Sequence, residues 1–113
     1  MALVTPLWAC EETSPAAARL GGNPERGRTL LVQYGCAYCH VIPRVDAPGG
    51  VFGPPLTNIG KRVYLAGVLP NSPENMTYWI RAPKAIKPQT AMPDLGVSET
   101  DARDMVAYLY RLR

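Results

Sequence analysis

The chain has 113 residues, enough for one domain but too few for two separate cores. It carries 10 glycines and 12 prolines but only 19% charged residues, so we expect long loops and a core that needs more than side chains to fill it. The net charge is +3, and the basic residues are spread along the chain. Nucleic acid is therefore not an expected partner, and no apolar run is long enough to span a membrane.

The first ten residues are apolar and end in Leu7-Trp8-Ala9-Cys10, which is similar to a bacterial lipoprotein cleavage site. We expect residues 1–10 to be a signal-peptide remnant or such a lipoprotein segment, with a lipid anchor at Cys10. The alternatives are a misplaced start codon or a signal remnant with a free thiol. Residues 11–22 lack hydrophobic periodicity and end in two glycines, which predicts a flexible tether before a domain over residues 23–113.

Caps and hydrophobic spacing predict three short helices. Asn23-Pro24 supplies an N-cap and a first-turn proline for a helix that leads to Cys36. Ser72-Pro73 begins a second helix, which must end before Pro83, and a loop is expected from Pro83 to Pro93. Ser98 opens a third helix, with Arg111 and Arg113 at its C-terminal end. No alternating run is long enough for a sheet. The expected fold class is all-α, with three or more short helices separated by long loops.

Two of the three cysteines lie in Cys36-Ala37-Tyr38-Cys39-His40, the C-x-x-C-H pattern of covalent haem attachment. The two thiols are spaced to bond the two vinyl-derived carbons of one haem c, and the neighbouring imidazole can bind the iron. A thioredoxin-like pair would need a βαβ context, and a zinc site would need a further Cys/His pair; the sequence contains neither. His40 is the only histidine, so the sequence predicts one haem without two-histidine ligation in a monomer.

A methionine is the expected sixth ligand of the iron. Met92 lies in a segment held open by prolines, so its side chain is not committed to a helix face. Its alternative role is that of a loop hydrophobe. Met1 lies in the leader segment, and Met76 and Met105 lie on expected helices, where a core role is the simpler interpretation. A thioether opposite an imidazole is typical of electron-transfer cytochromes.

With these motifs the chain resembles the class I cytochrome c family, from about Pro24 to Leu112. The other matching features are Gly53-Pro54-Pro55-Leu56, Trp79-Ile80, Thr90-Ala91-Met92-Pro93 and Tyr108-Leu109. The resemblance implies a cytochrome c fold, with helices and loops wrapped around one covalently attached haem. It also implies that the first and last helices cross with Gly27 against Tyr108. The carbonyl of Pro54 would accept a hydrogen bond from His40.

Haem propionates are anionic and need polar partners when buried. The candidates are Arg62, Tyr64, Trp79 through its indole N–H, and Thr90. The resemblance favours Arg62, whose alternative role is that of a solvated surface arginine. The apolar residues expected around the haem are Leu30, Leu56, Trp79, Ile80, Val106 and Leu109.

These features predict a one-electron carrier, and not an enzyme, that shuttles electrons between periplasmic or membrane redox partners. Its donor or acceptor would be a dehydrogenase, a quinol-oxidising complex or a terminal oxidase. The first alternative is a cytochrome subunit fixed to a dehydrogenase or oxidase complex; another is a haem sensor or peroxidase. Arg81, Lys84 and Lys87 would present positive charge near Met92 to an acidic partner. Covalent haem and the signal-like leader indicate a periplasmic location, either free or held to the membrane by lipid.

Overall fold

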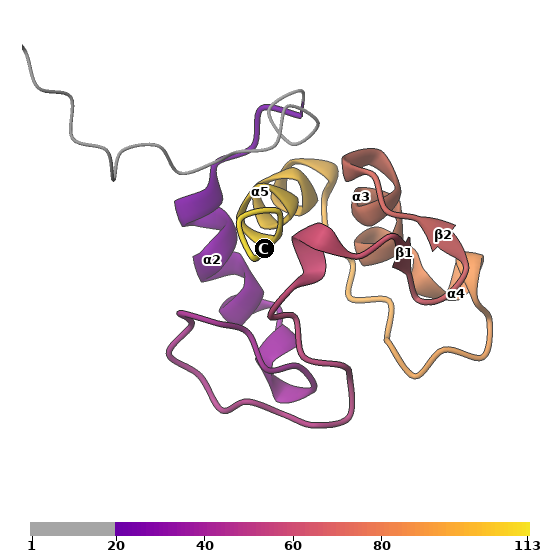
Figure 1. Cartoon of the computed structure of the whole chain (residues 1–113), viewed down its shortest axis with the longest axis horizontal. Helices are drawn as coiled ribbons and strands as arrows, with labels where there is room; N and C mark the ends of the chain where they lie inside the picture. The colour runs from indigo at the N-terminus through magenta and orange to yellow at the C-terminus, as the bar shows by residue number, and fades with distance from the viewer. Residues whose placement is uncertain (1–19) are drawn as a thin grey trace, which may run out of the picture.

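The computed structural model describes residues 20–113. The expected leader over residues 1–10, with Cys10, and most of the expected tether lie outside the described residues. The elements, in chain order, are α2 (Pro24–Gln33), η2 (Cys36–Tyr38), η3 (Ile59–Lys61), β1 (Tyr64–Leu65), β2 (Leu69–Pro70), α3 (Pro73–Arg81), α4 (Pro83–Ile86) and α5 (Glu99–Leu109) (Figure 1). The regular structure is mostly helical, as predicted. Among the helices of residues 20–113, none has the length and apolar character needed to cross a bilayer.

The three longer helices begin at the predicted caps. The side chains of Asn23, Ser72 and Ser98 each accept a hydrogen bond of 3.1 Å from the backbone N–H three residues further on. A proline follows the cap in α2 and α3, where its missing N–H would have no partner in the helix. Local sequence alone therefore determines where these helices start.

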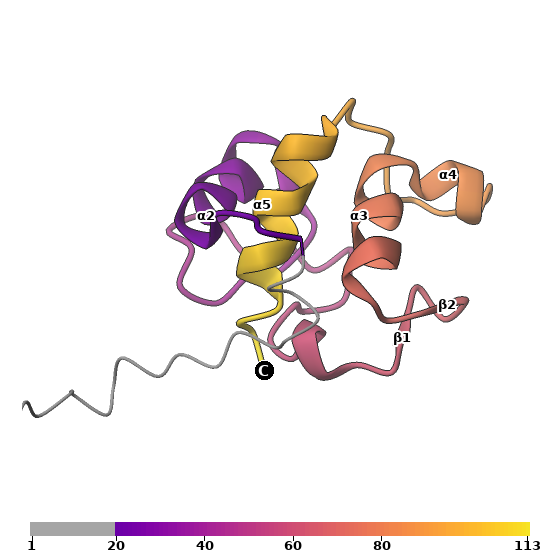
Figure 2. The same cartoon turned by 90° about the horizontal axis from the view of Figure 1, so that it is seen from above.

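Helices α2 and α5 form the main helix pair and cross at close range (Figure 2). A Cβ on Gly27 would overlap the backbone carbonyl of Asp104, so only glycine permits this approach. The expected crossing at Gly27 is present, and the nearest atoms of α5 belong to the Asp104 peptide, one helical turn before Tyr108. Tyr108 is buried, and its hydroxyl donates a hydrogen bond of 2.6 Å to the carbonyl of Pro43.

A group of charged and polar side chains, which we call the acidic clamp, also joins these two helices. Asp104, only 8% exposed, accepts hydrogen bonds from the backbone N–H of Asn23 at 2.8 Å and from Arg26 at 2.6 Å. Asp101 accepts hydrogen bonds from Tyr34 at 2.6 Å and from Arg26 at 2.7 Å. The hydrogen bond from Tyr34, and then that from Arg26, lowers the pKa of Asp101 below its ordinary value.

The core is a continuous cluster of buried apolar side chains, most of them from α2, α3 and α5. Of the residues expected around the haem, Leu30, Ile80, Val106 and Leu109 belong to this cluster. Leu56 packs against its edge, and Trp79 is half-buried. Part of the predicted core is therefore formed by the polypeptide itself.

A small hairpin was not predicted. Strands β1 and β2 pair antiparallel, with Leu65 opposite Leu69. Ala66 and Gly67 turn the chain between them, both with positive φ. Each strand has two residues, which is too short for an alternating pattern to be visible in the sequence.

The sequence also did not predict α4, and it placed the end of the last helix too late. Pro83 occupies the first position of α4, where proline is favoured, but four residues are too few for a helical period. The segment from Pro83 to Pro93 is therefore not all loop. Helix α5 ends at Leu109, so Arg111 and Arg113 follow the helix and do not lie in its last turn.

Candidate haem site

The cysteine turn begins where α2 ends. Gly35, with φ of +80°, reverses the chain into η2. The carbonyl of Cys36 then accepts hydrogen bonds from the N–H groups of Cys39 and His40, at 3.2 and 3.0 Å. This turn brings both cysteines and the histidine together within five residues.

Both thiols of the turn are free and partly buried. Burial raises the pKa of the Cys36 thiol to about 11, so the group stays protonated at neutral pH. A thioredoxin-like nucleophile or a zinc ligand needs the thiolate instead. Residues 20–113 also contain no group of three or more Cys, His, Asp or Glu that could hold a metal ion. The redox-pair and zinc interpretations therefore gain no support from the local environment.

The segment between η2 and η3 has no regular structure but returns to the cysteine turn three times. The N–H groups of Gly50, Gly53 and Leu56 donate hydrogen bonds to the carbonyls of Ala37, Cys39 and Val41, at 3.0, 2.7 and 2.9 Å. The long loop expected from its prolines and glycines is thus held by hydrogen bonds to the backbone of residues 37–41.

The imidazole of His40 is oriented by this loop. Its Nδ1 lies 2.7 Å from the carbonyl oxygen of Pro54, so the expected hydrogen bond is present. A carbonyl can only accept, which places the proton on Nδ1 and leaves the lone pair of Nε2 free. This is the state in which a histidine can bind a metal, and a partner on the other ring nitrogen fixes its direction.

Gly53 packs directly against the His40 ring, a role that was not expected from the sequence. A Cβ at this position would lie 2.8 Å from Nε2 and closer still to Cε1. The absence of a side chain at Gly53 therefore lets the loop approach the imidazole. In the sequence, the position of Gly53 directly before Pro54 was the feature that could have indicated this contact.

Arg62 also contacts this loop. One terminal nitrogen of its guanidinium donates a hydrogen bond to the carbonyl of Pro55, the residue after Pro54. Four further guanidinium N–H donors leave it able to bind an anion as well. Of the other propionate candidates, Tyr64 is 59% exposed on β1 and Trp79 is half-buried on α3. Neither is hydrogen-bonded to another predicted site residue in the described part of the chain.

Met92 lies in the loop between α4 and α5, half-buried, in a turn made by Thr90. The N–H of Thr90 donates to the carbonyl of Lys87 at 2.9 Å, and the Thr90 hydroxyl oxygen accepts from the N–H of Met92 at 3.2 Å. The Thr90 hydroxyl therefore shapes the methionine loop. Lys84 Nζ donates to the Thr90 carbonyl at 2.9 Å.

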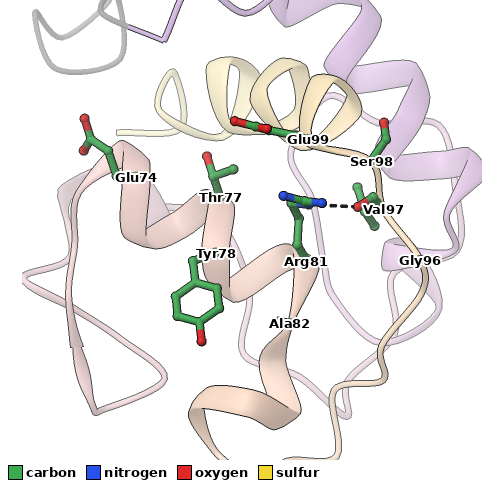
Figure 3. A pocket seen from close by; sticks show the side chains of 9 residues that line it. All are labelled: Glu74, Thr77, Tyr78, Arg81, Ala82, Gly96, Val97, Ser98 and Glu99. Atoms are coloured by element: carbon green, nitrogen blue, oxygen red, sulfur yellow. Dashed lines mark hydrogen bonds between the residues drawn. The ribbon is translucent and has the colours of Figure 1, made fainter.

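Arg81, expected among the positive charges near Met92, is exposed on α3 and contacts the chain just before α5. Its Nε donates to the carbonyl of Val97 at 3.1 Å, inside a pocket between α3 and the start of α5 (Figure 3). The residues that line this pocket are Glu74, Thr77, Tyr78, Arg81, Ala82, Gly96, Val97, Ser98 and Glu99. None of the predicted haem residues is among them, so this pocket is separate from the candidate site.

Residues 24–113 match the family model described as cytochrome c. The chain belongs to the cytochrome c family. It is 37% identical over 89 residues to cytochrome c oxidase subunit 2 of Alkalihalophilus pseudofirmus, a match covering 78% of this chain and 25% of that protein. It is 33% identical over 84 residues to cytochrome c oxidase subunit 2 of Bacillus subtilis, covering 69% and 24%. The matched part of the chain thus spans about a quarter of the length of each relative.

The residues of this cytochrome c fit a haem. The free lone pair of His40 and the paired thiols of one turn supply the donor types that the group needs. Large apolar side chains in the loop and hairpin segments are exposed, which leaves apolar surface that a bound group could cover. These include Val51 at 86%, Phe52 at 92%, Val63 at 75% and Val68 at 52%. Haem binding and electron transfer therefore follow for this member of the family.

Proposed function

We propose that this chain is a one-electron carrier whose haem c is attached through Cys36 and Cys39 and ligated by His40 and Met92. The observation that carries the proposal is the hydrogen bond from His40 Nδ1 to Pro54, because it directs a free imidazole lone pair from within the C-x-x-C-H turn. When bound, the haem supplies a ferrous–ferric couple.

The protein's own part is to hold both axial donors in place. Pro54 and Gly53 fix the imidazole, and the Thr90 turn holds the backbone of Met92, which supports a role for its thioether as the second ligand. With both ligands supplied by the chain, neither has to change when an electron enters or leaves. Such a site favours fast electron transfer over binding of small molecules.

Native mass spectrometry and ligand binding test this proposal together. We expect the mass of one haem to remain with the chain after denaturation and to be lost in Cys36→Ala/Cys39→Ala. We expect the native protein to bind carbon monoxide slowly, and Met92→Ala to bind it at least about tenfold faster. Met105→Leu, a volume-conserving change in the buried core, is the control and should bind it as slowly as the native chain. Equal rates for the native protein and Met92→Ala would exclude Met92 as a ligand.

A second candidate function is a cytochrome subunit of a terminal oxidase. Both relatives bear the name cytochrome c oxidase subunit 2, and this favours an oxidase as the acceptor. The exposed Lys84 of α4 and Lys87, which follows α4, could steer an acidic partner. Stoichiometric co-purification of oxidase subunits from native membranes would support the fixed subunit, and purification of the cytochrome alone would support the free carrier.

We further propose a periplasmic location, with residues 23–113 forming the haem domain. The signal-like leader and the covalent haem support this location. The same mass spectrum reports the N-terminus and any acyl chains on Cys10. An intact Met1 together with an unmodified Cys10 would exclude the lipid anchor.

A further inference from the structure

Lys84 contacts the methionine loop on both sides of Met92. Its side-chain Nζ donates to the carbonyl of Thr90 at 2.9 Å, two residues before Met92. Its backbone N–H lies 3.4 Å from Oδ1 of Asp94, two residues after Met92. One residue of α4 thus spans the ends of the five-residue segment that has Met92 at its centre.

The backbone from which the Lys84 side chain extends is held in place by Pro83. Pro83, which precedes Lys84, is among the most deeply buried residues of the described chain and starts α4 with a fixed φ. The Lys84 backbone is therefore anchored in the core while its side chain reaches outward over the loop. A charged donor on a backbone carbonyl also makes a stronger hydrogen bond than a neutral donor would.

We propose that Lys84 is a positioning residue that holds the Met92 loop closed and so controls how often the thioether leaves the iron. The proposal rests on the proposed ligation of the iron by Met92. It differs from the docking role expected from charge, because the ammonium group acts within its own chain and needs no partner protein.

Lys87, which follows the end of α4, provides a matched comparison three residues further along the chain. It carries the same charge and is also exposed, but its Nζ approaches the carbonyl of Ala66 in the hairpin, at 3.4 Å. Removing either ammonium changes the net charge equally. Lys87 contributes its backbone carbonyl to the turn before Met92, which Lys87→Met retains, whereas Lys84 contacts that turn with its ammonium group.

The experiment uses the haem-bound protein in four forms: native, Lys84→Met, Lys84→Arg and Lys87→Met. The first measurement is the rate at which saturating imidazole displaces Met92 from the oxidised protein. The displacement is monitored by NMR, as the loss of the strongly shifted signal of a haem-bound methionine methyl. The second is the hydrogen-exchange rate of the Met92 amide, which reports loop opening directly. Global unfolding in denaturant is measured alongside.

We expect Lys84→Met to raise both rates by about 3- to 10-fold, as loss of one hydrogen bond implies, with global unfolding nearly unchanged. Lys84→Arg keeps a donor and should stay near the native rates, and Lys87→Met should match the native protein. Native rates in Lys84→Met would overturn the proposal, as would an equal increase in Lys87→Met, since that result would reflect charge alone. If Lys84→Met unfolds globally, Lys84→Ala, which also removes the side-chain donor, replaces it with the same expectations.

The two proposals fail in different ways. Absence of the methionine signal in the native protein would refute ligation by Met92, and amide exchange would still decide whether Lys84 closes the loop. A native methionine signal with exchange and displacement that do not respond to Lys84 would refute only the positioning role.

Discussion

At the scale of single residues, Gly53 sets how closely the loop can approach the His40 ring. We predict that Gly53→Ala destabilises the haem-bound protein by roughly 1–3 kcal/mol, because a methyl group would overlap an imidazole that Pro54 already holds. Denaturant unfolding followed at the haem absorption band measures the change. Gly49→Ala is the control in the same loop, since its Cβ would lie 3.1 Å from a methyl of Val41, which can move. Equal effects at both positions would contradict the prediction.

At the scale of elements, the acidic clamp makes the α2–α5 pair sensitive to acid. The pKa of Asp101 is lowered in the folded protein, so its stabilisation is complete above the unfolded value of about 3.9. That stabilisation is lost as the pH falls through the lower folded value. The pKa of Tyr34 is raised, mainly by its hydrogen bond to Asp101, so the stabilisation from its hydroxyl is lost only as the pH rises above about 10.

We therefore predict that Asp101→Asn is less stable than the native protein at pH 7 but loses less of its stability between pH 5 and pH 2. Urea unfolding at several pH values measures both effects. Asp46→Asn, in the exposed part of the long loop, serves as the control and should follow the native curve. A parallel downward shift of the Asp101→Asn curve at every pH would show that the carboxylate acts only through packing.

The elements and contacts that could be predicted are those with local causes. The caps at Asn23, Ser72 and Ser98 depend on residues within one turn, and so could be recognised in the sequence. The hairpin and α4 have two and four residues per element, too few to show a period. The contact of Gly27 with the Asp104 peptide and the reach of Lys84 to Thr90 depend on how separate segments pack, which no local pattern encodes.

At the scale of the whole molecule, the α2–α5 pair has its own buried core, but the loops over residues 41–58 and 87–97 contain no helix or strand. We predict that the haem-free Cys36→Ala/Cys39→Ala chain is largely unfolded, because a group bound only by the native state adds its binding energy to folding. Circular dichroism melting is the measurement, and non-covalent addition of haem should restore helix. A cooperative, native-like melt without haem would contradict the prediction.

The three returns of the 41–58 segment to the cysteine turn also have a consequence for the order of folding. Gly53 and Cys39 are 14 residues apart in the chain, whereas Met92 follows His40 by 52. Closing a short loop loses less chain entropy than closing a long one, so the histidine side can form early and on its own. The methionine side must wait for α3 and α4 to pack. The two proposed iron ligands therefore belong to parts of the chain that fold at different stages. We expect the Met92 side, which forms later, to open first.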